Sequence, residues 1–409
     1  MALRLLPVAP NFPHDESLTW GTQILRGASG APQRIAVGSA LPRQRLAYYF
    51  TLRDTDQINA ARAVLYDQRD GLWPIPLWGQ RMLYRGVLSS GATSIAIDTT
   101  NAEFLATNDH VTGRVLIWRR DGDTVASEIA TVSAVAAGAL TVSTVANSYT
   151  NPWIVPCRTG YVVTKTPLRY HGLHAATLSM AFEVVDNWFV DAHTPDAEID
   201  DIEIVHAPGQ LTGSLDQQID PEVIPIDNNC GRLAIVAPQT YPTGTRPHGW
   251  VCQSRADCYA LRQRLYAWLG RQKSVLVPTH RPDLTLAAPA ASDATTIDVA
   301  ANDAVLYDGG RWRYYVSAKI GGTPVVKKVT GIATVSTSVE RLTLSSAFGT
   351  ALAAGSTLSW VERCRNASDT VALRWLFQDK LTCQIQWART WSPLAVQGDG
   401  VFGMGVLAG

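Results

Sequence analysis

His171 and His174 are the two residues whose spacing comes nearest to that of a metal-ligand pair in this sequence. They lie before or within a predicted strand, RYHGLHAATLSMAF, in which residues three positions apart point to opposite faces. Zinc sites bring such rings together on a helix or add cysteine and acidic ligands nearby, and this segment offers neither. We therefore predict no metal site and no cofactor site.

The cysteines and the densest run of acidic residues give no stronger candidate. The six cysteines are spread without the dense spacing of a disulfide scaffold, at positions 157, 230, 252, 258, 364 and 383. Because Cys258 falls on the apolar face of a predicted helix, we expect it to pack in a core. The acidic run lacks the glycine turn of an EF-hand and consists of Asp196, Glu198, Asp200, Asp201 and Glu203. We predict that it is a solvated arm that docks on basic residues of a neighbouring subunit.

The sequence contains none of the common catalytic motifs. A Gly-x-Ser-x-Gly elbow, a Walker loop, a His-Glu-x-x-His helix and a Gly-x-Gly-x-x-Gly turn that opens a helix are all absent. We therefore predict that the protein is not an enzyme and has no catalytic residues. Paired carboxylates that cleave glycosides have no fixed spacing along a chain, so an envelope-degrading hydrolase stays open as a third alternative.

Aromatic residues in two strand-rich segments suggest a second alternative, carbohydrate or receptor binding. These residues are Trp118, Trp312, Tyr314 and Tyr315. If their rings are exposed, they form a platform for sugars or a contact for another protein. Strand aromatics are more often half-buried, so ligand binding is not our first prediction.

The composition indicates a soluble, β-rich globular protein. Of 409 residues, 35 are Lys or Arg and 35 are Asp or Glu, and this balance argues against nucleic acid as the bound partner. No apolar run reaches about 18 residues, and prolines and acids interrupt the N-terminus, so we expect neither a membrane anchor nor Sec export. Thirteen Trp, 31 Gly and 22 Pro are typical of many short strands and turns.

Helical periodicity occurs in two places, at residues 56–69 and 255–269. Asp54 or Thr55 can cap the first helix, and Ser254 the second. Strand-like patterns fill much of the rest: RLAYYFTLR, TSIAIDTT, GRVLIWRR, ALTVSTVA, ATLSMAFEVVD, RLAIVAP, TTIDVAA, RWRYYVSA, RLTLSSAF, STLSWVERC and LTCQIQWART.

The two helices belong to an internal repeat with an offset of 200 residues. Identical residues stand at 60, 62, 65 and 66 and at 260, 262, 265 and 266. The order of surrounding segments repeats as well, with WPIP facing VLVP downstream of the helices and Cys157-Arg158 facing Cys364-Arg365. We therefore predict a tandem duplication.

The predicted fold is mainly β, with a tube-like β-sandwich domain and one helix in each copy, and a small β-barrel or sandwich module inserted into each. The first domain comprises residues 1–82 and 154–190, with its insert at 83–153. A connector arm covers 191–228. The second domain comprises residues 229–283 and 361–409, with its insert at 284–360.

The opening of the chain resembles tail-tip proteins of long-tailed, non-contractile bacteriophages. The segment LTWGTQILRGASGAPQRIAVGSALPRQRLAYYFTL is similar in its Trp20-Gly21-Thr22, Gln33-Arg34 and Pro42-Arg43 positions, and Trp73-Pro74 follows the helix in the same order. The second copy shares only the hydrophobic pattern. The resemblance implies a virion structural protein, either a distal tail ring or the hub below it.

A protein of this kind would join the tail tube to the tip and leave a channel through which DNA passes. Its expected partners are itself, the tail tube, tape-measure, hub and central fibre proteins, and its expected location is the tail tip of the virion. A chain with two tube-like domains fills six ring positions with three copies, so we predict a homotrimer with pseudo-six-fold symmetry. A hexamer, or a monomer or dimer whose two domains are merely similar, stays open.

Overall fold

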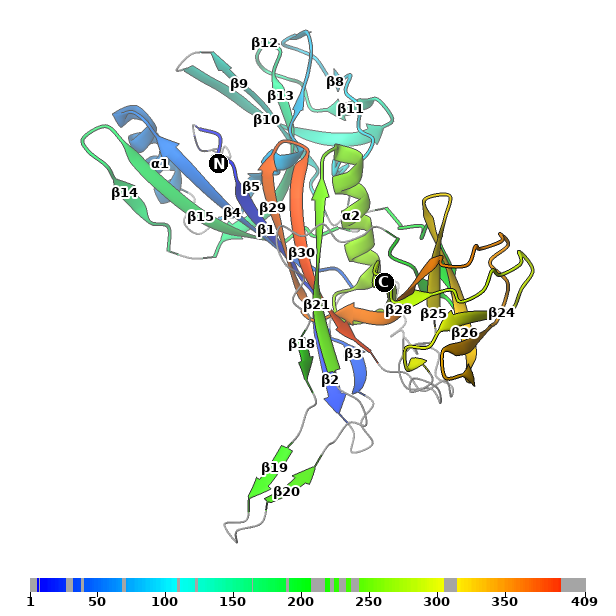
Figure 1. Ribbon diagram of the computed structural model, residues 1–409. Helices are drawn as coiled ribbons and strands as arrows, with labels where there is room; N and C mark the ends of the chain where they lie inside the picture. The colour runs from blue at the N-terminus through cyan, green and yellow to red at the C-terminus, as the bar shows by residue number, and fades with distance from the viewer. Residues whose placement is uncertain are drawn as a thin grey trace.

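The computed structural model describes residues 6, 8–26, 32–37, 40–67, 71–108, 111–121, 124–163, 165–188, 191–206, 218–220, 224–227, 233–236, 243–304 and 315–390. Within these ranges the chain is mainly β, as predicted. Two α-helices, α1 (Thr55–Asp67) and α2 (Arg255–Trp268), and a short 3-10 turn, η1 (Trp78–Gln80), accompany the strands (Figure 1).

We call the part of the chain before residue 190 half one and the part from residue 218 half two. The strands of half one are β1 (His14–Thr19), β2 (Thr22–Arg26), β3 (Pro32–Ala36), β4 (Arg43–Leu52), β5 (Trp73–Pro76), β6 (Met82–Leu83), β7 (Val87–Leu88), β8 (Ser94–Ile95), β9 (Arg114–Asp121), β10 (Thr124–Ala136), β11 (Ala139–Val142), β12 (Tyr149–Thr150), β13 (Trp153–Val162), β14 (Leu168–Tyr170) and β15 (Ala176–Val184).

The connector contributes a short hairpin, and half two repeats the strand series. The hairpin is β16 (Glu198–Ile199) and β17 (Ile202–Glu203), and half two contains β18 (Gln218–Asp220), β19 (Ile224–Asp227), β20 (Leu233–Val236), β21 (Thr243–Cys252), β22 (Val275–Pro278), β23 (Leu284–Thr285), β24 (Thr296–Ala300), β25 (Tyr315–Ile320), β26 (Thr323–Ser336), β27 (Val339–Leu344), β28 (Thr357–Asn366), β29 (Thr370–Phe377) and β30 (Lys380–Arg389).

The strand pairings of the two halves match. Each half begins with a strand that pairs with the strand before the helix, β1 with β4 and β18 with β21, and a hairpin lies between them in sequence. The long strand after each insert, β13 or β28, pairs in both halves with the strand that follows the helix, with the insert and with the last strand. The two halves therefore share one scheme of strand pairing.

Local sequence explains where the helices begin. The Asp54 side chain accepts a hydrogen bond of 2.6 Å from the Gln57 backbone N–H at the start of α1. Ser254 forms a capping box with Asp257 at the start of α2, and Leu269 ends that helix with a left-handed backbone. Both helices therefore begin at the residues that their caps predict.

Each insert has a hydrophobic core of its own. The first core contains residues from Met82 to Ile154 and the second residues from Leu284 to Trp360. Strands β10 and β26, which the sequence did not predict, form the long hairpin arms of these modules. Figure 1 shows the first insert above the central strands and the second to their right.

Strand β1 joins the two halves into one sheet. It pairs antiparallel with β4 of half one along one edge and with β29 of half two along the other. Leu18 of β1 and Trp20, which follows the strand, lie in the core of half two with α2, β21 and β30. Half two therefore folds around a strand that half one supplies.

The connector differs from the exposed arm that the sequence predicts. Ile202 and Ile204 are buried, and they pack with Leu276 and Val361 in a small core on the outside of half two. Ile204 also forms a parallel bridge with Leu276. The segment around β16 and β17 is thus part of the packed structure.

We expect the replacement of Leu18 by Ala to lower the free energy of unfolding by about 2–5 kcal/mol, because its side chain is fully buried in the core of half two. Leu25, which is 42% exposed on β2, is the control, and its replacement by Ala should change stability by less than about 0.5 kcal/mol. Urea unfolding of both variants checks this. Equal effects would contradict the role of β1 in the second core.

Candidate functional site: the junction between the halves

The most unusual side chains of the described structure are charged groups buried where the two halves meet. Four of them come from four separate elements: Glu16 of β1, Glu103 of the first insert, Arg158 of β13 and Arg262 of α2. Arg262 is 1% exposed and is among the largest fully buried side chains. A charge in such a place is tolerated only with a close opposite charge and satisfied hydrogen bonds.

Glu16 is held by donors from both halves. Its Oε1 accepts hydrogen bonds from Gln44 Nε2 at 2.7 Å and Arg262 Nη1 at 2.6 Å. Its Oε2 accepts one from the Trp375 indole N–H at 2.8 Å. The antiparallel register places Glu16 opposite Leu46 on one side and Leu373 on the other, so its carboxylate is fixed by both neighbouring strands.

Glu103 closes the network from the side of the first insert. Its Oε2 accepts hydrogen bonds from Arg158 Nη2 at 2.8 Å and from Arg262 Nη2 at 3.3 Å, and its Oε1 also contacts Arg262 Nε. Gln80 of η1 donates from Nε2 to Oε1 at 2.8 Å and accepts from the Glu103 backbone N–H at 3.1 Å. Two carboxylates thus face two guanidinium groups, and the formal charge of the cluster is zero.

The pKa shifts in the network follow from burial and charge pairing. Burial works to raise the pKa of the Glu103 carboxyl, but the charges of Arg262 and Arg158 and the hydrogen bond from Gln80 outweigh it. The pKa therefore lies below its usual value. Burial works to lower the pKa of Arg262, and the carboxylates of Glu103 and Glu16 raise it above its usual value. Both groups are held in their charged forms.

Close packing surrounds the charges. His14 of β1 stacks on Trp375 with ring centroids 6.3 Å apart, and burial followed by the charge of Arg81 lowers the pKa of His14 to about 3. A Cβ added to Gly79 of η1 would lie 2.4 Å from the Trp375 ring, so the backbone of half one touches this ring directly. Only glycine allows that approach. The junction is a solid interface of charged, aromatic and backbone groups.

The arrangement is suited to fixing two parts of a chain together and not to turnover. Each described carboxylate oxygen of the network already accepts hydrogen bonds from protein donors, and the four side chains are nearly inaccessible to solvent. A catalytic acid or base needs access to a substrate proton. What the site does physically is set the register and the angle between the halves.

The structure separates the histidines that come nearest to a ligand pair in the sequence. His171 Nε2 is 3.0 Å from Thr177 Oγ1, and His174 Nδ1 is 2.9 Å from Thr55 Oγ1. Among the described residues, no group of three or more His, Cys, Asp or Glu side chains could hold a metal ion. The predicted packing role of Cys258 is confirmed, because Cys252 and Cys258 are both buried with free thiols.

The acidic segment packs on half two instead of forming a free arm, although of its five acids only Glu203 is buried and the other four stay exposed. Asp196 pairs with Arg264 at 2.7 Å, Asp200 with Lys328 at 2.6 Å, and Glu203 accepts a hydrogen bond of 2.6 Å from the Trp268 indole. The prediction that these acids dock on a neighbouring subunit is therefore wrong for these three residues, because their partners lie in half two of the same chain. Half two offers the basic and aromatic side chains that the connector needs to fold onto it.

Trp118 offers no aromatic platform, in line with the half-buried position that strand aromatics more often have. The ring is 8% exposed and meets Trp78 edge-on, with centroids 5.5 Å apart. Tyr315 is also buried, whereas Trp312 and Tyr314 lie outside the described residues. Burial in a core removes the open ring face that a sugar would need.

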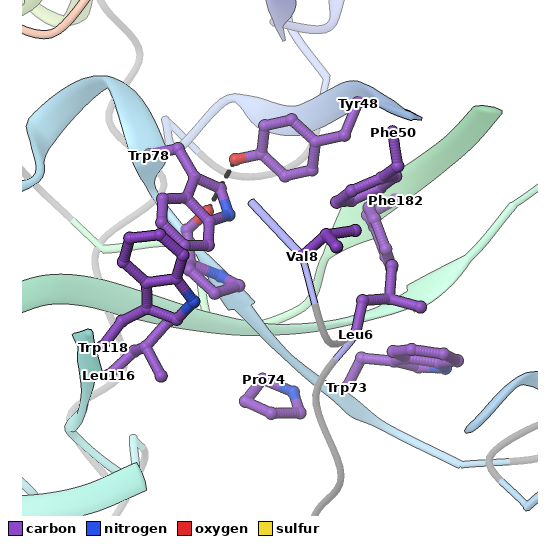
Figure 2. Close-up of a pocket in the computed structure, with 11 residues that line it drawn as sticks. Leu6, Val8, Tyr48, Phe50, Trp73, Pro74, Trp78, Leu116, Trp118 and Phe182 are labelled. Carbon is purple, nitrogen blue, oxygen red and sulfur yellow. Dashed lines mark hydrogen bonds between the residues drawn. The ribbon is translucent and has the colours of Figure 1, made fainter. Parts of the chain in front are cut away.

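Trp118 instead lines an apolar pocket of half one (Figure 2). The pocket is narrow, with a volume of about 30 Å³, and its lining residues are Leu6, Val8, Tyr48, Phe50, Trp73, Pro74, Pro76, Trp78, Leu116, Trp118 and Phe182. The Tyr48 hydroxyl donates to the Pro76 carbonyl at 2.7 Å. Because the Tyr48 hydroxyl is engaged in this hydrogen bond, the pocket suits an apolar side chain better than a polar ligand.

Sequence reasoning missed the charged residues of the junction. Positions 16, 103, 158 and 262 are far apart in the chain, and no local motif links them. The sequence does contain one indication of a buried charge. Helical spacing places Arg262 beside Leu261 and Leu265 on the buried side of α2. An arginine at such a position indicates a buried acidic partner.

We expect the replacement of Arg262 by Met to destabilise the protein by about 3–5 kcal/mol, because Glu16 and Glu103 would be left buried without their shared cation. The matched control is Arg62, at the equivalent position of α1, which is exposed. Arg62→Met should change stability by less than about 0.5 kcal/mol. Thermal unfolding of both variants measures the difference in stability. Similar losses of stability in the two variants would contradict a specific role for the buried network.

Acid should weaken the junction in a way that depends on Glu103. Its folded pKa lies below the ordinary value of 4.5, so the unfolded chain takes up this proton at a higher pH than the folded one, and stability is lost as the pH falls through that range. His14, with a folded pKa of about 3 against 6.5, adds a loss that begins below about pH 6.5.

The variant Glu103→Gln isolates the first of these effects. At pH 7 it should be less stable than the parent protein, and the gap should narrow below about pH 4.5 because the parent alone loses the carboxylate. The contribution of His14 is common to both proteins and cancels in the comparison. Urea unfolding between pH 3 and pH 7 provides the measurement, and a gap that stays constant would contradict the pairing.

Comparisons with known proteins identify no family. No protein-family model matches the chain, and no curated protein matches it either. In the part of the chain that the structure describes, no helix is long and apolar enough to cross a membrane.

Proposed function

We propose that the protein is a structural component of a bacteriophage tail tip that forms a ring at the distal end of the tail tube. In this role it acts as a distal tail or hub protein, joins the tube to the tip or fibre, and leaves a channel for DNA. It has no catalytic role in this proposal. The resemblance of residues 18–78 to tail-tip proteins suggests the setting, and the fold supports it.

The observation that carries the proposal is the side-by-side union of two equivalent halves in one sheet. The first strand of half one continues the sheet of half two, and the halves share the same pairing scheme. The surfaces in contact are different on the two sides, with β1 on one side and β29 on the other. Such a head-to-tail contact closes into a ring when it is repeated at a suitable angle.

The number of halves favours three chains in the ring. A six-position ring needs six equivalent domains, and each chain supplies two of them already fixed in place by the buried charges. A trimer can then match a six-fold tube on one face and a three-fold spike or fibre on the other. The proposed partners are therefore the tail tube, tape-measure, hub and fibre proteins.

The junction also favours a structural role over ligand binding. The buried network contributes rigidity, whereas the aromatic residue that the sequence offers for sugar binding, Trp118, is enclosed in a core. A receptor-binding module remains the alternative only through Trp312 and Tyr314, which lie outside the described residues.

Localisation in phage particles tests the proposal. We expect an epitope inserted at Gly138, in the exposed turn between β10 and β11, to be labelled by gold-conjugated antibody at the distal end of the tail. A Cβ at Gly138 would meet nothing within 4 Å, so the turn has room for an insertion. Particles with the untagged chain are the control.

The mass of the isolated assembly tests its stoichiometry. Three chains of 44.4 kDa give 3 × 44.4, about 133 kDa, which native mass spectrometry distinguishes from a monomer or a hexamer. Absence of the chain from purified particles, or label along the side of the tail, would overturn the proposed function. A hexamer at the tail tip would overturn only the three-chain arrangement.

A further inference from the structure

The surface of half one that corresponds to the buried junction of half two is exposed. Strands β4 and β21 are offset by 200 residues and β15 and β30 by 205, as their pairings show. On this basis α1 presents Arg62 and Tyr66 where α2 presents Arg262 and Tyr266. Arg62 is exposed and Tyr66 is 71% exposed, whereas Arg262 is 1% exposed and Tyr266 packs in the core of half two.

The edge strand next to this helix shows the same contrast. Leu168-Arg169-Tyr170 of β14 occupies the positions of Leu373-Arg374-Trp375 of β29, because both triplets pair with equivalent residues of the last strand. Trp375 is 3% exposed beneath β1, and Tyr170 is 55% exposed. Half one therefore carries an uncovered copy of the surface that β1 covers in half two.

We propose that this surface binds β18 of a second copy of the chain, in the arrangement by which β1 binds β29 within one chain. β18 is the counterpart of β1, since Asp220 pairs with Thr243 of β21 as Thr19 pairs with Arg43 of β4. In the described part of the chain β18 pairs with β21 alone and β14 with β15 alone. Both strands thus have one edge available for pairing.

The register of the contact follows from the internal junction. Thr19 lies opposite Thr370 there, with their hydroxyl oxygens 3.1 Å apart. The equivalent positions in two chains are Asp220 and Lys165, so the contact places an acidic residue opposite a basic one and sets β18 against residues 165–167, directly before β14. Opposite charges facing each other across an antiparallel pair favour that register.

Proline at position 167 does not block this edge. The Pro167 carbonyl accepts a hydrogen bond from Ser179 of β15, so the backbone polar groups of residue 167 face β15. In an antiparallel strand the neighbouring residues face the other way, and Thr166 and Leu168 therefore direct their N–H and C=O groups to the outer edge. A missing N–H at Pro167 costs nothing there.

The contact uses different surfaces on the two chains, β18 with its half on one and β14 with α1 on the other. When each chain makes this contact with the next one, the chains follow one another head to tail. The ring of the proposed function forms when the last chain of such a series binds the first. The contact itself rests on the observed internal junction and does not depend on the phage setting.

Disulfide trapping between two variants tests the contact. Chains that carry only Asp220→Cys are mixed with chains that carry only Lys165→Cys, in a background with Cys230→Ser; the five described native cysteines are buried. We expect a disulfide-linked pair that contains one chain of each kind, and no linked pair from either variant alone. The internal reference is Thr19→Cys with Thr370→Cys, which links within one chain.

The oxidation conditions are those under which the reference disulfide forms completely, so a negative result is informative. No link between the mixed variants would overturn the proposed contact, even if the protein assembles in another way. Links between identical Asp220→Cys chains would overturn it as well, because they indicate a symmetric contact between like surfaces.

Substitution on the uncovered surface gives an independent measurement. We expect Tyr66→Ala and Tyr170→Ala each to raise the dissociation constant between chains at least tenfold in sedimentation experiments, and Tyr66→Phe to retain most of the affinity. Val335→Ala, at a 50% exposed position near the tip of the β26–β27 hairpin, should have no effect. Unchanged association in both alanine variants would overturn the proposal.

The two proposals fail in different ways. A cross-linked pair from a chain that is absent from phage particles would leave this contact in place and remove the tail-tip function. A chain found at the tail tip that does not form the link would keep the function and remove the contact.

Discussion

The pairing of Glu16 with Arg262 is the constraint on which the arrangement of the two halves depends. One charge lies on the first strand of half one and the other on the helix of half two, and both side chains are almost completely buried. A junction that buried either group without the other would leave an uncompensated charge, at a cost of several kcal/mol. The network therefore makes each half an obligatory partner of the other, even though a buried ion pair adds little net stability compared with apolar packing.

The same pairing specifies the register of β1. A slip by one residue would turn Glu16 and Leu18 to the opposite face and remove both the carboxylate from the guanidinium and the leucine from the core of half two. Gly79 adds a steric condition, because its backbone touches the Trp375 ring. Charge, apolar burial and close contact all favour one arrangement, so the junction is expected to be rigid.

Much of the fold was predictable from local patterns, and the junction was not. The helix starts followed from Asp54 and Ser254, and the two inserts followed from the repeat. Strand β29 was missed although its residues alternate, and β10 was missed because its many Ala, Ser and Thr residues resemble a turn-rich segment. Local patterns reveal which face of an element is apolar, but they do not reveal which distant element covers that face.

The connector and Trp118 illustrate the same limit. Glu203 of the acidic segment and Trp118 of β9 both look solvent-exposed in the sequence, yet Glu203 is buried against Trp268 and Trp118 against Trp78. The internal repeat predicts a shared fold but not shared surroundings. It indicates that two segments have the same fold, but equivalent residues such as Arg62 and Arg262 occupy different surroundings, because β1 and the first insert cover only one of them.

This difference between equivalent residues has a physical basis in how the two contacts form. Within one chain the halves are tethered, so their effective concentration is high and they can bear the desolvation of four charges when they dock. Separate chains meet at low concentration and must also lose translational and rotational freedom. A contact between chains is therefore better served by backbone pairing, an aromatic surface such as Tyr66 and Tyr170, and charges that remain near water.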